Sequence, residues 1–200
     1  MKTKDLLIII FIFFTFFSCL KKKKTLELHT SFIDMEQVFK DVKAEELFEK
    51  ANKSYELGEF EVAKNLLTKA NKIEESAIIY NQLGVIETTL ENYEKAVFLF
   101  KKGKSLDSKH WGNYINESRC YIKMKEYENA EKVLTNLILL TDSKYWKAYA
   151  NFYLALRFFN DGNQCKKTLY YFELSKEIKN DVQLKYIYMK VENKIKEYCG

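Results

Sequence analysis

The stretch YNQLGVIETTLENYEKAVFLFKKGKSLD, residues 80–107, decides the fold of this chain. Its first large residue, Tyr80, is followed four positions later by the small residue Gly84, which puts both on one face of a helix. Tyr93 then opens a second apolar stripe that continues through Phe100 at helical spacing. The stretch therefore predicts a pair of helices in which the small residue lets the second helix approach the first closely.

The same pattern is written three times between Ala44 and Asp142, and each landmark position recurs after 33 and then 34 residues. The seven sets are Leu47, Tyr80 and Tyr114; Ala51, Gly84 and Ser118; Phe60, Tyr93 and Tyr127; Ala63, Ala96 and Ala130; Leu67, Phe100 and Leu134; Ala70, Gly103 and Leu137; and Ile73, Leu106 and Leu140. A period of this length is typical of a stacked repeat array. A single hairpin cannot bury its apolar stripes alone, so neighbouring hairpins must stack.

These residues resemble tetratricopeptide (TPR) repeats, closely over residues 80–107 and nearly as well over residues 47–74. The resemblance implies an all-α, right-handed α-solenoid of about four hairpins, at residues 44–76, 77–110, 111–144 and 145–181, with a capping helix over residues 182–200. The chain departs from the family pattern at five positions: Glu75, Ser108 and Asp142 stand where the family has Pro, Lys125 where it has a turn Gly, and Leu137 where it has a small residue. The packing positions survive, so the predicted fold is unaffected.

The ends of the expected helices are set by local signals. Ser76, Ser108 and Ser143 precede first helices and are suitable N-cap residues. The fourth unit fits the pattern with a small insertion around residues 160–164, after which a helix should run from Cys165 to about Lys179. Asp181 should cap a last helix, Val182 to Tyr198, with Leu184, Ile187, Val191 and Ile195 facing inward and Lys185, Lys190, Glu192 and Lys196 on its polar face.

Residues 1–18 are expected to form a targeting segment. Lys2 and Lys4 are followed by an apolar run from Leu6 to Phe17 that is too short to span a bilayer. Because Ser18 precedes Cys19 directly after this run, the segment resembles a bacterial lipoprotein signal, which implies lipidation of Cys19 and a location at a bacterial membrane. We expect the outer membrane, on its periplasmic or surface side. An ordinary secretory signal and an uncleaved anchor are the alternatives.

Residues 19–43 read as a tether. Lys21–Lys24 suit anionic lipid headgroups as well as a simple solvated spacer. Phe32, Met35 and Phe39 lie at helical spacing and predict a short helix that either caps the first hairpin or hangs loosely from it.

Composition argues against several classes of function. The chain has 200 residues, no proline to break helices, and a net charge of +5 that arises wholly from residues 2–24. The folded part is therefore neutral overall, which disfavours nucleic-acid binding. No catalytic constellation, phosphate loop or metal-ligand cluster stands out, since His29 and His110 lie in unrelated contexts. We expect no enzyme activity, no cofactor and no metal.

Three cysteines follow Cys19. Cys120 reads as a small core residue. Cys165 and Cys199 should lie at the same end of two antiparallel helices, where they either form a disulfide or remain as two free thiols.

Partner binding is the leading functional hypothesis. In the family that the chain resembles, first helices line a concave face that holds a protein or peptide. The corresponding positions in this sequence are Phe48, Asn52, Tyr55, Asn81, Val85, Thr88, Ile115, Arg119, Ile122, Tyr149 and Phe152. A lipid-anchored scaffold of the cell envelope is the favoured interpretation. Glycan binding by Tyr149, Phe152 and Tyr153 is the alternative, and a purely structural or oligomerisation module is a third.

Overall fold

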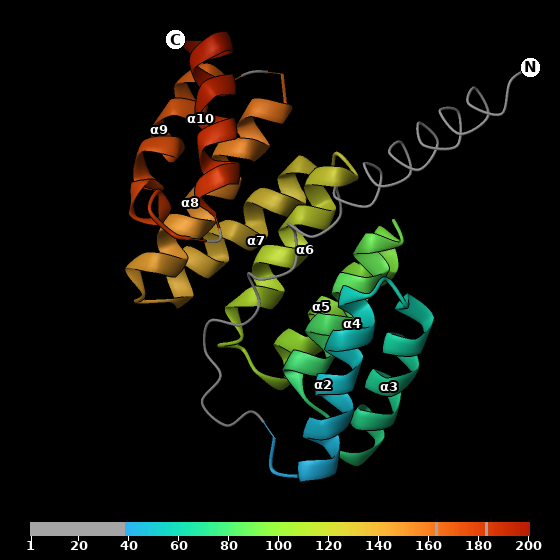
Figure 1. Cartoon of the computed structure of the whole chain (residues 1–200). Coiled ribbons are helices and arrows are strands. Elements are labelled where there is room, and N and C mark those ends of the chain that lie inside the picture. Colours follow the sequence, from blue (N-terminus) through green and yellow to red (C-terminus); the bar gives the residue numbers. More distant parts are fainter. Residues whose placement is uncertain (1–38, 163, 183) are drawn as a thin grey trace, which may run out of the picture. The chain divides into compact units, whose positions relative to one another are not determined.

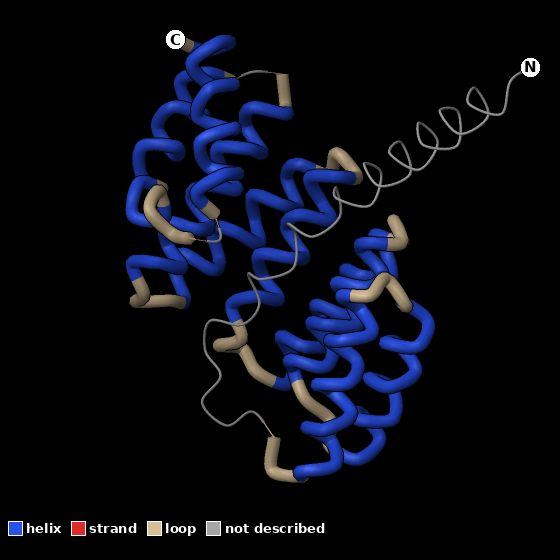
Figure 2. Tube along the Cα trace, viewed as in Figure 1, coloured by secondary structure: helices blue, strands red, loops and turns tan. Residues whose placement is uncertain are grey.

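The computed structural model describes residues 39–162, 164–182 and 184–200, and within those ranges all regular structure is helical (Figures 1 and 2). The helices in chain order are α2 (Val42–Glu56), α3 (Phe60–Ile73), α4 (Ala77–Thr89), α5 (Tyr93–Leu106), α6 (Trp111–Lys123), α7 (Tyr127–Leu140), α8 (Lys144–Asn160), α9 (Cys165–Leu174), the 3₁₀ helix η2 (Lys176–Ile178) and α10 (Lys185–Cys199).

Consecutive helices pair into four hairpins, α2/α3, α4/α5, α6/α7 and α8/α9, and each hairpin packs on the next. The first helices α4, α6 and α8 also contact one another in order, and α10 closes the array against α9. The predicted all-α, right-handed α-solenoid of about four hairpins and a closing helix is therefore confirmed.

The landmark positions explain why the helices pack so closely. A Cβ atom added to Gly84 on α4 would lie 2.5 Å from Cε1 of Phe100 on α5, a distance that no real side chain tolerates. Leu67, Phe100 and Leu134, which occupy one landmark position in three repeats, have no exposed surface. The sequence pattern thus identified the contact within each hairpin correctly.

One landmark set differs from its expected role. Ile73, Leu106 and Leu140 close the second helices, and they are 40%, 45% and 50% exposed. Their position in the last turn of each helix explains this exposure. The chain leaves the helix there for the next hairpin, so no neighbouring helix in the described part of the chain fully covers these three side chains.

The turn inside each hairpin requires a left-handed backbone. Gly58, Glu91, Lys125 and Gly162 have φ values of 80°, 63°, 62° and 75°. Glycine adopts this conformation without steric cost, whereas other residues are disfavoured there. The second and third hairpins therefore keep the turn geometry although they lack the glycine that suits it.

The fourth hairpin is built differently from the others. Helix α8 has 17 residues where α4 and α6 have 13 each. Helix α9 ends at Leu174 rather than near Lys179, because the hydroxyl of Ser175 donates to the Phe172 carbonyl at 2.6 Å and the chain continues as a 3₁₀ turn. The insertion predicted around residues 160–164 falls between the two helices of this hairpin.

Capping also differs in detail from the expectation. Ser143 Oγ accepts a hydrogen bond from the Trp146 amide at 3.4 Å, but the side chain of Ser76 makes no such bond. Ser108 is not the N-cap residue of α6, because that helix begins after His110. Asp181 accepts from the Leu184 amide at 2.9 Å, and α10 then begins at Lys185 rather than Val182.

Helix α10 is held by a buried aromatic residue that the sequence pattern did not single out. Tyr188 is 1% exposed, and its ring lies 5.7 Å from that of Phe152 and 4.7 Å from that of Phe172. Leu184 and Ile195 are buried beside it as expected. The closing helix therefore belongs to the same core as α8 and α9.

Candidate protein-binding face

The first helices α2, α4 and α6 are joined side by side by hydrogen bonds between their side chains. Gln82 Nε2 donates to Asn52 Oδ1 at 3.0 Å, and the hydroxyls of Tyr55 and Thr89 lie 2.7 Å apart, both between α4 and α2. One junction further along, Asn81 Nδ2 on α4 donates to an asparagine of α6 at 3.1 Å. These bonds fix the spacing of the helices that form the candidate face.

The structure divides the expected face residues into two groups. Six are buried in the packing between helices: Phe48, Tyr55, Asn81, Ile115, Tyr149 and Phe152. Five are half-buried: Asn52, Val85, Thr88, Arg119 and Ile122. A partner that lies on this face would therefore touch mainly the second group, while the first group sets the shape of the face.

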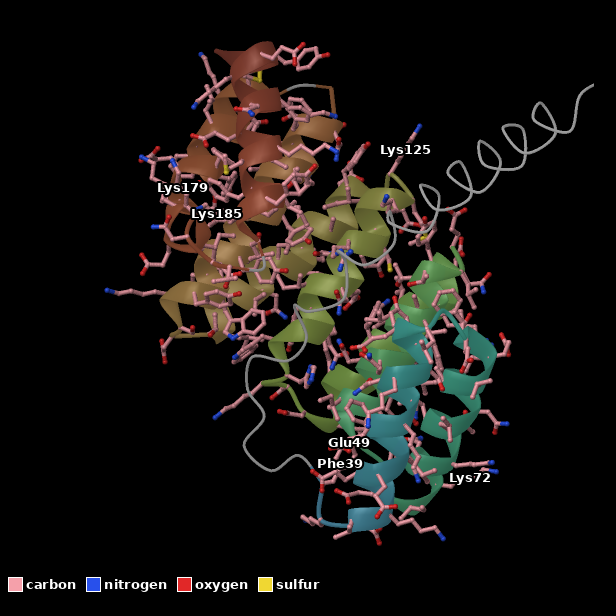
Figure 3. All side chains as sticks on the ribbon, in the orientation of Figure 1. Phe39, Glu49, Lys72, Lys125, Lys179 and Lys185 are labelled. Atoms are coloured by element: carbon pink, nitrogen blue, oxygen red, sulfur yellow. A yellow bond between two sulfur atoms is a disulfide. The ribbon has the colours of Figure 1, made fainter. Side chains whose placement is uncertain are left out.

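Sequence reasoning missed the most exposed side chains of the same helical faces. Glu45, Glu49 and Glu56 on α2 are exposed, and Glu49 can be followed on α2 in Figure 3. They lie three or four residues from expected face residues and so share a helix face with them. A search for charged residues at these offsets, rather than for aromatic and amide residues, would have found them.

A buried polar chain lies between α4 and α6. Asn113 has no exposed surface, accepts from Asn81, and its amide nitrogen lies 3.1 Å from Nδ1 of His110. Burial lowers the pKa of the His110 imidazole, although the nearby Asp107 carboxylate opposes the shift. The network leaves Asn81 Oδ1 without a hydrogen-bond partner among the described residues. It therefore acts as a rigid polar connection between two repeats rather than as an open site.

The aromatic residues proposed for glycan stacking are mostly used in packing. The ring of Tyr149 lies 5.8 Å from that of Trp146 and 5.5 Å from that of Tyr153, and Tyr149 and Phe152 are buried. Of the three residues in the glycan hypothesis, Tyr153 alone keeps part of its surface. Stacking on a sugar ring would need more aromatic surface than these three residues expose.

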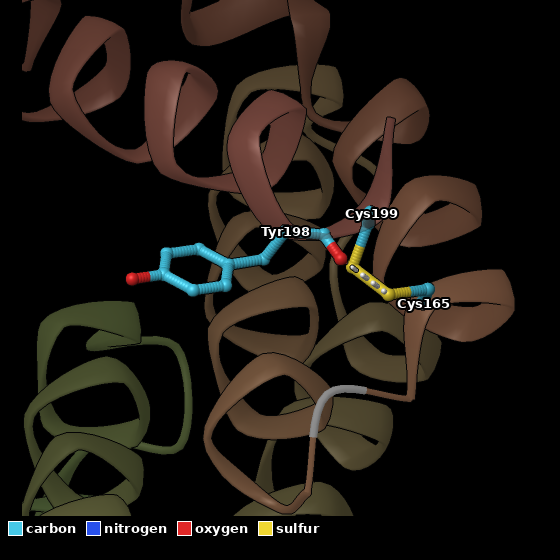
Figure 4. The surroundings of a disulfide bond; sticks show 3 residues. All are labelled: Cys165, Tyr198 and Cys199. Carbon is cyan, nitrogen blue, oxygen red and sulfur yellow. Dashed lines mark hydrogen bonds between the residues drawn. A yellow bond between two sulfur atoms is a disulfide. The ribbon is translucent and has the colours of Figure 1, made fainter.

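Cys165 and Cys199 are joined by a disulfide (Figure 4), with their Cα atoms 5.2 Å apart. The bond links the start of α9 to the end of α10 and encloses residues that form η2 and most of both helices. Cys120 is a buried free thiol, and burial raises its pKa. The disulfide therefore fastens the closing helix to the last hairpin.

The signal-like segment, Cys19 and most of the tether lie outside the described residues. Phe39, the first described residue, packs its ring 5.2 Å from that of Phe48 on α2. No helix in the described ranges is both long and apolar enough to cross a membrane, and those ranges hold no group of three potential metal ligands.

The sequence model of the family Tetratricopeptide repeat matches residues 77–110 and 112–143, which are the second and third hairpins. Residues 77–143 therefore contain two tetratricopeptide repeats. The matched residues include Gly84, Phe100 and the other landmark positions of the second and third hairpins.

Solved structures with the same arrangement support the fold. The protein MamA of Desulfovibrio magneticus RS-1, from residue 41 to its end, is 21% identical, with a TM-score of 0.57 over 68% of this chain and 76% of that one. A further crystal structure of MamA is 18% identical, with a TM-score of 0.58 over 67% and 77% of the two chains. No curated protein matches the chain in sequence. At this identity the likeness shows the shared fold alone, because one fold can carry many unrelated functions.

Proposed function

We propose that this TPR protein is a non-enzymatic scaffold that binds a protein or peptide along the faces of its first helices, and that it works at a bacterial envelope through a lipid on Cys19. The observation that supports binding is the continuous face of α2, α4 and α6. The Asn52–Gln82 and Tyr55–Thr89 hydrogen bonds join α2 to α4, and the Asn81–Asn113 hydrogen bond joins α4 to α6. A face that spans several repeats without depending on one pocket suits an extended or helical segment of a partner.

Site-specific photo-crosslinking tests this proposal. A photoreactive phenylalanine analogue at Glu49, Val85 or Lys123 should capture the same partner in native membranes, because these positions lie on three adjacent first helices. The same analogue at Glu94 and Glu128, which are exposed on the second helices α5 and α7, serves as the control. Equal capture from both sets of positions, or none from the first, would refute binding on this face.

The lipid anchor needs a separate experiment. Cells grown with an alkyne-bearing fatty acid should label the wild-type protein, and the Cys19→Ser variant should lose both the label and its sedimentation with membranes. Cys120→Ser is the matched control, since Cys120 is buried and should not accept a lipid. Labelling that survives Cys19→Ser would show that the lipid is attached to another residue, and an unlabelled wild-type protein would show that there is no such lipid.

Glycan binding remains the second candidate. The cluster of Tyr145, Trp146, Tyr149 and Tyr153 on α8 is the observation that favours it, because the rings of the other three lie 5.9, 5.8 and 5.5 Å from the ring of Tyr149. Burial of Tyr149 and Trp146 weighs against it. A thermal-shift screen with oligosaccharides separates the two functions, since a stabilising oligosaccharide would favour the second.

A further inference from the structure

Three stripes of side chains run along corresponding faces of α2, α4 and α6, and we call them the inner stripes. Each consists of four residues separated by four, three and four positions, which is the spacing of one helical face. The members are Glu45, Glu49, Asn52 and Glu56 on α2; Ile78, Gln82, Val85 and Thr89 on α4; and Gly112, Asn116, Arg119 and Lys123 on α6. Corresponding members of neighbouring stripes are one repeat apart in the sequence.

The inner stripes are physically adjacent. The Asn52–Gln82 hydrogen bond joins a member of the α2 stripe to a member of the α4 stripe, and Tyr55 bonds to Thr89 of the α4 stripe. Helix α4 is joined to α6 by the Asn81–Asn113 bond one residue away from the stripes. The three stripes therefore lie side by side. Because Ile78, Gln82, Gly112 and Asn116 are buried, the accessible part of the stripes on α4 and α6 consists of Val85, Thr89, Arg119 and Lys123.

The charge of this surface changes in steps along the array. The α2 stripe carries three exposed carboxylates, the α4 stripe carries no charge, and the α6 stripe carries Arg119 and Lys123. No ion pair joins Glu45, Glu49 or Glu56 to another described residue, whereas Arg119 donates to Asn116 Oδ1 within its own stripe at 3.2 Å. The surface is therefore acidic over α2, neutral over α4 and basic over α6.

The two charged ends act independently of each other. Packed helices lie about 8–10 Å apart, so α2 and α6 are separated by about 16–20 Å. The Debye length at physiological ionic strength is about 8 Å, so each end presents its own local potential to a partner. A ligand of uniform charge would be attracted at one end of the surface and repelled at the other.

As a refinement that rests on the proposed function, we propose that the partner segment is dipolar: its Lys- or Arg-rich part lies over α2 and its Asp- or Glu-rich part lies over α6. An extended peptide rises about 3.3 Å per residue, so about five or six uncharged residues separate the two parts. These residues cross α4, where Val85 offers a half-buried apolar surface. Charge complementarity of this kind sets specificity and association rate more than raw affinity.

The charges of the chain's own tether do not fit this pattern. Phe39 is fixed against Phe48 on α2, and the nearest charges before it in the sequence are Glu36 and Asp34. If the tether were to bind along this surface from Phe39 onward, Glu36 and Asp34 would come next to the carboxylates of α2, which would repel them. A separate partner with the opposite charge order is therefore the occupant that the surface favours.

Fluorescent peptides of identical composition test the charge order directly. The first peptide has three lysines, five uncharged residues and three glutamates in blocks, and the second alternates the same charged residues. With the full chain in detergent at 50 mM salt, the block peptide should bind about tenfold more tightly than the alternating one by fluorescence anisotropy. The preference should largely disappear at 300 mM salt. Equal affinities at low salt would overturn the proposal.

Charge reversal on the protein provides the matched comparison. The triple variant Glu45→Lys, Glu49→Lys, Glu56→Lys makes both ends of the surface basic, so the block peptide should lose its advantage and a wholly acidic peptide should bind best. The control Glu59→Lys, Glu94→Lys, Glu128→Lys changes net charge equally at exposed sites on or beside the second helices and should leave the preference intact. The same loss in both triple variants would mean that net charge alone decides, which contradicts the proposal.

Selection from a random peptide library distinguishes failure of this inference from failure of the proposed function. Peptides whose binding depends on Val85 but which lack charge asymmetry would overturn the inference and leave partner binding on this face standing. Peptides indifferent to Val85→Glu would count against both. The variants Phe32→Asp and Met35→Asp test whether the tether itself occupies the surface. If either substitution raised the affinity of the protein for every peptide, the tether would be the occupant, and this too would overturn the inference.

Discussion

Lys64 on α3 and Glu87 on α4 form an ion pair across the first repeat junction, with Nζ and Oε1 3.4 Å apart. Glu87 is 1% exposed and also accepts from Lys95 at 2.8 Å and from Asn92 at 2.9 Å. Burial raises the pKa of Glu87, but the hydrogen bonds from Lys95 and Asn92 and the charge of Lys64 outweigh it and hold the pKa below its ordinary value. The first junction therefore contains a buried and fully partnered carboxylate.

The third junction has the same arrangement with the charges exchanged. Glu131 on α7 occupies the repeat position of Lys64, and it pairs at 3.0 Å with the buried Arg157 of α8. At the second junction the corresponding residues are Val97 and Tyr121, which belong to one apolar cluster. A separate pair, Lys104 with the buried Glu117, crosses the second junction. The junctions therefore differ in where their buried charge lies and in its sign, and a hairpin stacked on the wrong neighbour would leave a buried charge without a partner.

Exchange of the charges at the first junction tests this account. Lys64→Glu and Glu87→Arg should each destabilise the protein by about 2 kcal/mol, because each places like charges together beside a buried group. The double variant places Glu on α3 and Arg on α4, which is the order of Glu131 and Arg157 at the third junction. Its loss of unfolding free energy should be about 1 kcal/mol smaller than the sum of the two single losses. Urea denaturation followed by circular dichroism measures the effect, and strictly additive single effects would show that the pair is not coupled.

The repeated landmark positions made the fold predictable, because their spacing encodes which residues must be small and which large. Gly84 and Phe100 are an example, since the pattern placed a small residue where α5 comes within contact of α4. The fourth hairpin was less predictable. Its second helix breaks at Ser175, where a buried hydroxyl bonds to the local backbone and no apolar period marks the change.

The candidate face could be predicted only in part. Periodicity shows which helix face a residue occupies but not how closely the next first helix approaches it. Asn81 was expected at the surface, yet the approach of α6 buries it against Asn113. Conversely, Glu49 reads as an ordinary solvated charge until the alignment of α2 with α4 and α6 shows that it belongs to a graded surface.

The left-handed turns give a direct test of backbone strain. Glu91→Gly and Lys125→Gly should each stabilise the protein by about 0.5–1 kcal/mol, since φ near 62° suits glycine and the relief of strain exceeds the entropy that glycine adds to the unfolded chain. Gly58→Ala is the opposite control and should cost about 1 kcal/mol, although nothing lies within 4 Å of the added Cβ atom. Thermal denaturation measures all three, and a destabilising Lys125→Gly would contradict the explanation.

The buried imidazole of His110 predicts how stability depends on pH. Because burial lowers its folded pKa below the ordinary value of 6.5, the unfolded chain takes up a proton near pH 6.5 that the folded chain does not. Stability should therefore fall as pH drops from 6.5 toward 5, by at most about 1.4 kcal/mol per pH unit. Above pH 7.5 this contribution is complete and the curve should be flat with respect to His110.

Two variants isolate that effect in urea denaturation between pH 5 and 8. His110→Asn should flatten the curve in this range, and His29→Gln should leave the slope unchanged. A slope that persists in His110→Asn would assign the pH dependence to other groups.

Loss of the disulfide should loosen the closing helix and spare the rest of the array. The Cys165–Cys199 bond closes a loop of 34 residues, and a loop of that length stabilises a fold by about 3–4 kcal/mol in the chain-entropy account. Because each repeat contacts only its neighbours, Cys199→Ser should speed amide hydrogen exchange in α10 and α9 while α4 keeps its protection. Tyr188 and Ile195 remain to hold α10 by packing alone, so the helix should still dock, but with more frequent opening. Dithiothreitol should reproduce the effect in the wild type and add nothing in Cys199→Ser. Equal exchange rates in oxidised and reduced protein would mean that packing alone determines the stability of this end.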